Sequence, residues 1–337
     1  MARLDEDISR RISILRYLMI FGIIMLHTPP YVPLADTGPG VFDFIKASFQ
    51  HAIFRASVPV LTFVSGFLLF RSRMDLRPRQ LFVKKTRTIL IPLVLFNVPV
   101  AVAIYLIQAG HLLDHQFSQQ LYPFDPETWL SAITGLFSAP VNYPLNFLRD
   151  LYILSLLAPL MGLLLRLAWV GLGIVFTVFW FNYDGALILR NTMPIVFYLG
   201  GMAATQAWDL RRLDRLAAPL LLLFLALCAA IVLLKIENRD YLRLVSPFLI
   251  WPAASLLVHN RFGLWLASLS KYSFLTFLAH SPLVLIAYLV YTKLLPEWPY
   301  WLYWVATPVI SAIILAQVYI YSQRYVPKTM NLLLGGR

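Results

Sequence analysis

The sequence predicts an all-α integral membrane protein with about ten transmembrane helices. Of its 337 residues, 60% are hydrophobic and only 13% are charged, which is well beyond the apolar share of a soluble domain. The apolar residues come in blocks of about 20, the length that an α-helix needs to cross a bilayer. Most of the 28 Lys and Arg residues fall between these blocks, as positive charges do in the cytoplasmic loops of membrane proteins. We therefore expect one membrane domain over residues 1–337, with no separate soluble domain.

The first predicted span, residues 11–28, carries two residues that a simple anchor does not need. Arg16 and His27 are eleven residues apart, so at about 100° per residue they return to within about 20° of the same helix face. Along the helix axis they are separated by about 16 Å. Because charge inside a membrane is costly, both are candidates for a functional site. The alternative is that Arg16 reaches the lipid headgroups and His27 marks the membrane interface.

The later spans follow in order, separated by loops of alternating charge. They are predicted at about 47–70, 88–108, 146–166, 168–182, 193–208, 217–235, 243–259, 272–292 and 300–322. The span at 168–182 is marginal in length, so we expect it to be tilted, re-entrant or supported by its neighbours. Residues 71–87 form the most basic loop, whereas residues 109–145 contain no Lys or Arg. This alternation predicts that both termini are cytoplasmic and places Arg190 and Arg243 among the few basic residues of the opposite side.

Composition also excludes several classes of protein. The net charge of +12 does not indicate a nucleic-acid-binding protein, because the basic residues lie in short loops between apolar blocks. Cys228 is the single cysteine, so no intramolecular disulfide can form. The sequence contains no cluster of metal ligands and no Gly-rich phosphate loop, and we expect no metal.

A basic segment precedes the third span. Lys84 and Arg87 are three residues apart, so a helix would present both on one face. Together with Arg16, these cations suit a polyanion such as a nucleotide phosphate. The alternative is that they only fix the topology of the chain.

Five short segments carry a resemblance to a known family. They are Arg16-x10-His27, VPVLTFVSGFLLF (58–70), Lys84-Lys85-Thr86-Arg87 followed by ILIPL (89–93), PLNFLRDLYIL (144–154) and FLAHSPL (277–283). In this order the chain resembles the acyltransferase-3 family of membrane-bound O-acyltransferases over most of its length. It departs from the family pattern at Lys84, Asn146 and Ser281, where Arg, Trp and Pro are usual.

The resemblance implies transfer of an acyl group, usually acetyl, from cytoplasmic acyl-CoA to a sugar hydroxyl on the outer side of a bacterial inner membrane. Arg16, Lys84 and Arg87 would bind the CoA phosphates, and the separation of Arg16 from His27 is comparable to the pantetheine arm. His27 would act as a general base, or carry the acyl group itself. Succinyl is the alternative to acetyl. The implied partners are membrane lipid and a glycan or polyprenyl-linked oligosaccharide acceptor, with polysaccharide synthesis or export machinery as a further partner.

Further polar residues are assigned to the acceptor side. Arg149 and Asp150 are adjacent and point about 100° apart, so we expect them to pair with different helices or to contact the acceptor, with a structural ion pair as the alternative. His280 either orients the acceptor or satisfies a carbonyl freed by Pro282. Arg55 is expected to meet an acceptor or lipid phosphate near the outer surface.

Two other classes of function use the same residues differently. A transporter or flippase for an anionic or lipid-linked solute would use the cations as a pathway. Two symmetric halves with broken helices in matching positions would favour a transporter, and the sequence does not display them. A structural subunit of a polysaccharide export complex would not need Arg16 and His27.

Overall fold

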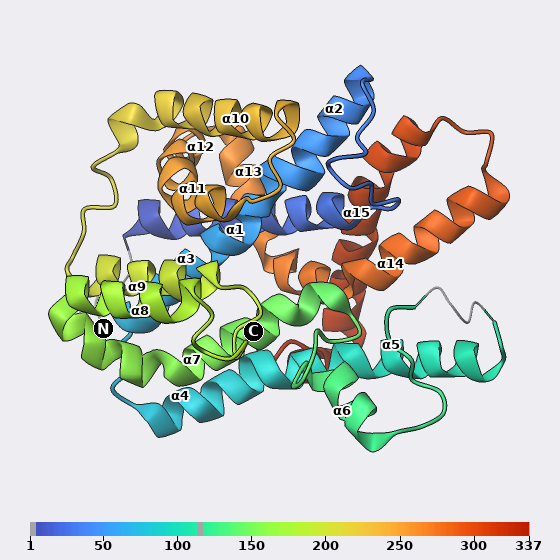
Figure 1. Ribbon diagram of the computed structural model, residues 1–337, viewed down its shortest axis with the longest axis horizontal. Coiled ribbons are helices and arrows are strands. Elements are labelled where there is room, and N and C mark those ends of the chain that lie inside the picture. The colour runs from blue at the N-terminus through green and yellow to red at the C-terminus, as the bar shows by residue number, and fades with distance from the viewer. Residues whose placement is uncertain (1–4, 113–116, 337) are drawn as a thin grey trace.

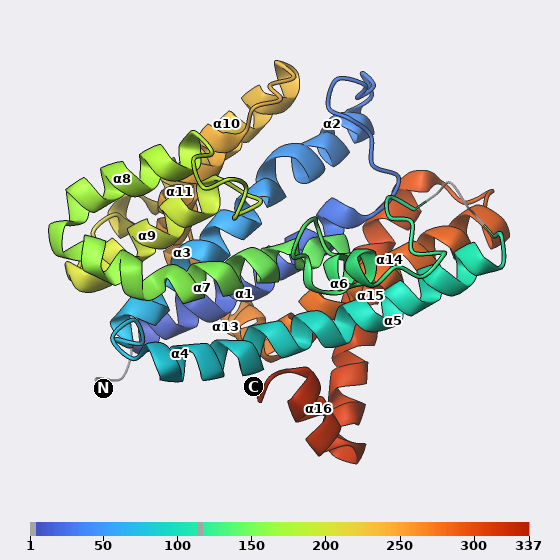
Figure 2. The same ribbon diagram turned by 60° about the horizontal axis from the view of Figure 1, so that its bottom comes forward.

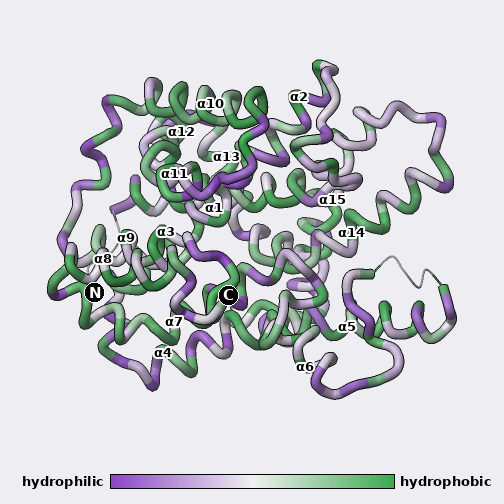
Figure 3. Tube along the Cα trace, viewed as in Figure 1, coloured by the Kyte–Doolittle hydropathy of each residue, from purple (hydrophilic) through white to green (hydrophobic). Residues whose placement is uncertain are grey.

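The computed structural model describes residues 5–112 and 117–336, and helices are the only regular secondary structure among these residues (Figure 1). Seven helical stretches in these ranges are long and apolar enough to cross a membrane. They are Val41–Arg71, Pro78–Ala109, Tyr143–Trp180, Asp214–Leu233, Asp240–Val258, Arg261–Leu294 and Tyr300–Tyr325. Apolar residues dominate most of the helices in Figure 3. The predicted all-α membrane fold is thus confirmed, whereas the number ten and the sidedness of the termini stay predictions.

Three predicted spans differ from a simple apolar membrane helix. Helix α1 (Glu6–His27) is 22 residues long but carries Arg10, Arg11 and Arg16, so it is not among the seven stretches. Helix α9 (Thr192–Thr205) is apolar but has only 14 residues. The marginal span at 168–182 is helix α8 (Ala168–Trp180), which packs back against α9 and against its own predecessor α7 (Asn146–Leu164).

Helix α1 runs through the middle of the molecule (Figure 2). It packs against α3 (Ser57–Arg71), α13 (Arg261–Leu269), α14 (Ser273–Leu294) and α15 (Tyr300–Tyr325). Two of its side chains, Ile14 and Ile24, are fully buried. The helix that carries the arginine–histidine pair is therefore surrounded mainly by protein.

Helices α3 and α9 approach each other closely at two glycines. A Cβ atom on Gly66 would lie 2.2 Å from the carbonyl oxygen of Phe197, and one on Gly200 would lie 2.2 Å from that of Phe63. Small residues allow this kind of backbone contact between membrane helices. The contact fixes α3, which borders both cavities described below.

Helix α4 (Pro78–Lys85) continues through a π-helical turn (Thr86–Leu90) into α5 (Ile91–Ala109), and α4 and the turn pack against α7. Single π-helical turns inside helices are frequently found at functional sites. The remaining α-helices are α2 (Val41–Ala47), α6 (Pro126–Thr134), α10 (Ala217–Leu233), α11 (Asp240–Ala253), α12 (Ser255–Val258) and α16 (Pro327–Leu333).

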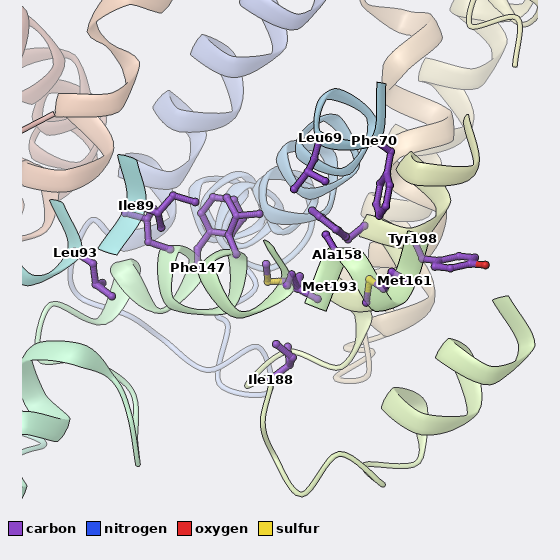
Figure 4. Packing of buried hydrophobic residues seen from close by; sticks show 14 of the residues in the cluster. Leu69, Phe70, Ile89, Leu93, Phe147, Ala158, Met161, Ile188, Met193 and Tyr198 are labelled. Atoms are coloured by element: carbon purple, nitrogen blue, oxygen red, sulfur yellow. The ribbon is translucent and has the colours of Figure 1, made fainter. Parts of the chain in front are cut away.

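The larger of the buried apolar clusters lies between α3, the π-helical turn, α7 and α9. Figure 4 shows part of it, including Leu69, Phe70, Ile89 and Phe147. This cluster holds α7 in place beside α3 and so determines where Phe147 lies. A second cluster joins α1 to α3 and α11.

Candidate functional site

Two cavities lie along one face of α1. The first, which we call the lysine cavity, has a volume of about 350 Å³ and is bordered by Arg16 and Ile20 of α1. The second, the histidine cavity, has a volume of about 300 Å³ and is bordered by Ile23 and His27 of the same helix. Arg16 and His27 therefore share one helix face, as their spacing predicts.

The lysine cavity collects the predicted cations only in part. Lys84 lines it together with Arg16, and Lys85 joins them. Arg87 is not among the described residues that line either cavity. Instead it lies beside the C-terminal turn, where a Cβ atom on Gly336 would be 3.2 Å from Arg87 Nη2. The cavity thus holds three basic side chains, from α1 and the end of α4, in a lining that is otherwise mainly apolar and comes from α1, α3, α7 and α14.

His27 is held in a defined tautomer by its own helix. Its Nδ1 lies 2.9 Å from the carbonyl oxygen of Ile23, one turn earlier. A carbonyl can only accept a hydrogen bond, so the proton of the neutral ring is assigned to Nδ1. The lone pair is then on Nε2, which is the arrangement that a general base requires.

His280 is the immediate neighbour of His27. The two ring centroids are 5.5 Å apart, and His280 Nδ1 lies 2.8 Å from the carbonyl oxygen of Phe277. The same argument therefore places the lone pair of His280 on Nε2, which is buried without a hydrogen-bond partner. The alternative role in satisfying the carbonyl freed by Pro282 is wrong, because Asn142 Nδ2 donates to that carbonyl, on Leu278, at 3.2 Å.

Three arginines line the histidine cavity, and only Arg55 was singled out from the sequence. Arg55 donates to the hydroxyl of Tyr31 at 3.1 Å. Arg190 Nη2 donates to Asn146 Oδ1 at 2.5 Å, while Arg190 Nη1 is buried without a hydrogen-bond partner. Arg243 pairs with Asp240 at 2.6 Å.

Arg190 and Arg243 were not predicted as site residues, because in the sequence they resemble ordinary basic residues of a loop. The one available signal was Asn146, where the chain departs from the family pattern. This side chain is the hydrogen-bond acceptor for Arg190.

Arg149 and Asp150 pair with each other rather than with different helices. Arg149 Nη1 lies 2.8 Å from Asp150 Oδ1, and both side chains are buried. Arg149 also donates to the carbonyl oxygens of Gly135 and Leu187, and the backbone N–H of Leu189 donates to Asp150. The expectation of separate helix partners is thus wrong, and the pair forms the ion pair that was its alternative, with backbone groups of neighbouring loops as the other partners. The pair fixes the loop that leads to Arg190.

No group of three or more His, Cys, Asp or Glu side chains within residues 5–112 and 117–336 could hold a metal ion. The polar side chains that line the two cavities are the imidazole of His27, six Lys and Arg side chains, the carboxylate of Asp240, the amide of Asn191 and several hydroxyls.

Comparison with known proteins gives two matches over nearly the whole chain. Residues 10–321 match the family described as "Acyltransferase domain", acyltransferase 3. The succinoglycan biosynthesis protein ExoH of Rhizobium meliloti (strain 1021) is 31% identical over 351 residues, covering 99% of this chain and 94% of that protein. No solved structure matches the chain.

Proposed function

Because the chain belongs to the acyltransferase-3 family, we propose that it transfers an acyl group from acyl-CoA to a sugar hydroxyl of an exopolysaccharide or its lipid-linked precursor. The name of its relative, a succinoglycan biosynthesis protein, supports an exopolysaccharide as the class of acceptor. The observation that carries the proposal is the single face of α1, which borders a basic cavity at Arg16 and a second cavity at His27.

In this proposal the lysine cavity binds the donor. Arg16, Lys84 and Lys85 would form charge-assisted hydrogen bonds with CoA phosphates. The pantetheine arm would then run along α1 past Ile20 and Ile23 to His27. Its length is comparable to the separation of Arg16 and His27, which is about 16 Å along the helix axis. Arg87 would contact phosphate outside the cavity, where the donor enters from the cytoplasm.

The chemical step would take place at His27. Its Nε2 removes the proton of the sugar hydroxyl as the oxygen attacks the thioester carbonyl carbon. The C–S bond breaks, and the imidazolium returns the proton to the CoA sulfur, giving an O-acyl sugar and free CoA. The alternative is a covalent acyl group on His27, which rapid quenching of the protein with acyl-CoA alone would trap.

Acetyl is the first candidate for the acyl group, and one observation favours succinyl as the second. Arg55, Arg190 and Arg243 all line the cavity of His27, and Arg190 Nη1 is buried without a partner. The free carboxylate of a succinyl group would pair with such a guanidinium, whereas an acetyl group has no charge to offer.

The acceptor side of the site would be organised by the remaining predicted residues. His280 would orient the hydroxyl beside His27, and Arg55 would bind an anionic part of the acceptor. Arg149 and Asp150 would act by positioning, since they hold the loop that places Arg190 in the histidine cavity.

The first experiment measures alkali-labile ester groups on the cell's exopolysaccharide for the wild type, His27→Ala and Arg16→Ala. We expect both variants to lose the ester, because one removes the base and the other a phosphate contact. Exposed residues outside both cavities, His259 and Arg166, provide the matched controls His259→Ala and Arg166→Ala. Mass spectrometry of the released acid distinguishes acetyl from succinyl.

Membrane expression is matched by immunoblot in every strain. Unchanged ester with reduced export of the polysaccharide would contradict the proposal and favour a transporter or an export subunit.

A further inference from the structure

Two aromatic side chains border both cavities. Phe147 of α7 and Phe277 of α14 line the lysine cavity and also the histidine cavity. Their ring centroids are 5.7 Å apart with the planes at 83°, an edge-to-face pair. We infer that Phe147 and Phe277 form a gate that controls when the acyl thioester passes from the lysine cavity to His27, an inference that rests on the proposed function.

The position of the pair fits a barrier on the path of the donor arm. Arg16 and Ile20 border the lysine cavity, whereas Ile23 and His27 border the histidine cavity, so the two cavities meet at the turn of α1 between Ile20 and Ile23. Phe147 and Phe277 are 6% and 2% exposed, so both rings are enclosed by protein where the two cavities adjoin. In this proposal a thioester arm anchored at Arg16 passes the two rings to reach His27, and the gate opens when one of them moves.

The gate is linked to the histidine pair. The carbonyl oxygen of Phe277 accepts the hydrogen bond from His280 Nδ1, and the ring of Phe277 lies 6.1 Å from the ring of His280. His280 Nε2 is buried without a partner, which is rare for a polar atom in a folded protein. Displacement of the Phe277 ring would open space beside this nitrogen for an N–H of the donor arm or a hydroxyl of the acceptor.

A closed gate has a chemical benefit. Water that reaches the thioester at His27 would react as the sugar hydroxyl does: its oxygen would form a bond to the carbonyl carbon and the C–S bond would break, with the proton passing through His27 to sulfur. The products would be a free carboxylic acid and CoA. Two apolar rings between the cavities keep donor and water apart until the path opens.

The test compares transfer with hydrolysis in purified protein reconstituted in nanodiscs. Release of CoA thiol from acetyl-CoA and succinyl-CoA is measured with and without de-esterified exopolysaccharide, and ester formed on the polysaccharide is measured in parallel. The variants are Phe277→Ala, Phe147→Ala and the conservative Phe277→Leu. Phe224→Ala removes a buried ring of α10 that borders neither cavity and serves as the control.

We expect CoA release without acceptor to rise roughly tenfold in the alanine variants, which corresponds to a barrier lower by about 1.4 kcal/mol. Ester formed per CoA released should fall in the same variants, and Phe277→Leu should lie between them and the wild type. Addition of His27→Ala to Phe277→Ala should abolish the extra hydrolysis.

Two results have different meanings for the two proposals. If the wild type transfers acyl groups but the ratio of hydrolysis to transfer is the same in the folded Phe variants, including Phe277→Leu, the gate is wrong and the acyltransferase stands. If the wild type releases no CoA and forms no ester, the proposed function itself fails, and the gate with it.

Discussion

Arg16 and Lys84 meet in the lysine cavity from two helices, and their distance from His27 predicts a kinetic separation of roles. Removing one charge-assisted phosphate contact costs about 1.5–3 kcal/mol, so Arg16→Ala and Lys84→Ala should raise KM for acyl-CoA by roughly 10- to 100-fold. We expect kcat to change little, because neither residue borders the cavity of His27. The measurement is steady-state release of CoA thiol.

Donor variants sharpen this prediction. Each variant is also measured with an acyl-CoA that lacks the 3′-phosphate. If the substituted residue binds that phosphate, the substitution should raise KM less for this donor than for the intact acyl-CoA. Equal losses with both donors would place both side chains on the diphosphate of CoA, whereas a fall in kcat alone would contradict a phosphate role.

Asp75 provides a pH-dependent prediction outside the membrane helices. Burial raises the pKa of its carboxyl above the ordinary value, and Asp75 Oδ1 is buried without a hydrogen-bond partner. A carboxyl whose pKa is raised in the folded chain holds its proton more tightly there than in the unfolded chain. Protonated Asp75 therefore stabilises the fold at low pH, and this stabilisation is lost as the pH rises through the folded pKa. Asp75→Asn should therefore raise the melting temperature at pH 7.5 and much less at pH 4.5.

Melting curves in detergent at the two pH values measure this effect. Asp36→Asn, a substitution at an exposed loop carboxylate, serves as the control. A shift of the same size at both pH values would rule out a protonation effect.

At the scale of the elements, the contact between α3 and α9 depends on two glycines. Gly66→Ala and Gly200→Ala would each place a methyl group 2.2 Å from a backbone oxygen, so the helices must separate. Overpacking of this kind costs about 1–3 kcal/mol or more, and we expect lower melting temperatures and loss of activity, since α3 borders both cavities.

Gly173 of α8 is the matched control. A Cβ atom there meets nothing within 4 Å, so Gly173→Ala should be neutral or slightly stabilising. Unaltered stability of Gly66→Ala would show that the two helices can separate without cost.

Helical periodicity is a local property, and it therefore predicted the shared face of Arg16 and His27 correctly. Each predicted span also contains a helix in the structure. Contacts between distant segments were not predictable from the sequence. His280 contacts His27 because α14 packs on α1. Arg190 lines the histidine cavity because Arg149 and Asp150 hold its loop in place. Adjacent residues such as Arg149 and Asp150 were misjudged because helical angles describe Cβ directions and not the ends of long side chains.

At the scale of the whole molecule, charge alternation predicts which loops share a side of the membrane. In a Cys228→Ala background, Leu76→Cys and Arg212→Cys should react with an impermeant maleimide only after the cytoplasmic side is opened. Ser118→Cys and Asn238→Cys should react on intact spheroplasts. All four positions are exposed, so differences in labelling report sidedness. Labelling of Leu76→Cys and Ser118→Cys from one side would refute the topology.

The central place of α1 has a consequence for biosynthesis. This helix leaves the ribosome well before α13, α14 and α15, which pack around it and begin only at Arg261. Because α1 carries three arginines, its insertion into the lipid bilayer without other helices around it is energetically unfavourable. We therefore expect it to remain at the membrane interface, or with the insertion machinery, until α13, α14 and α15 have been synthesised. A ribosome stalled before residue 261 would leave this helix without three of the helices that surround it, and more exposed to quality-control proteases.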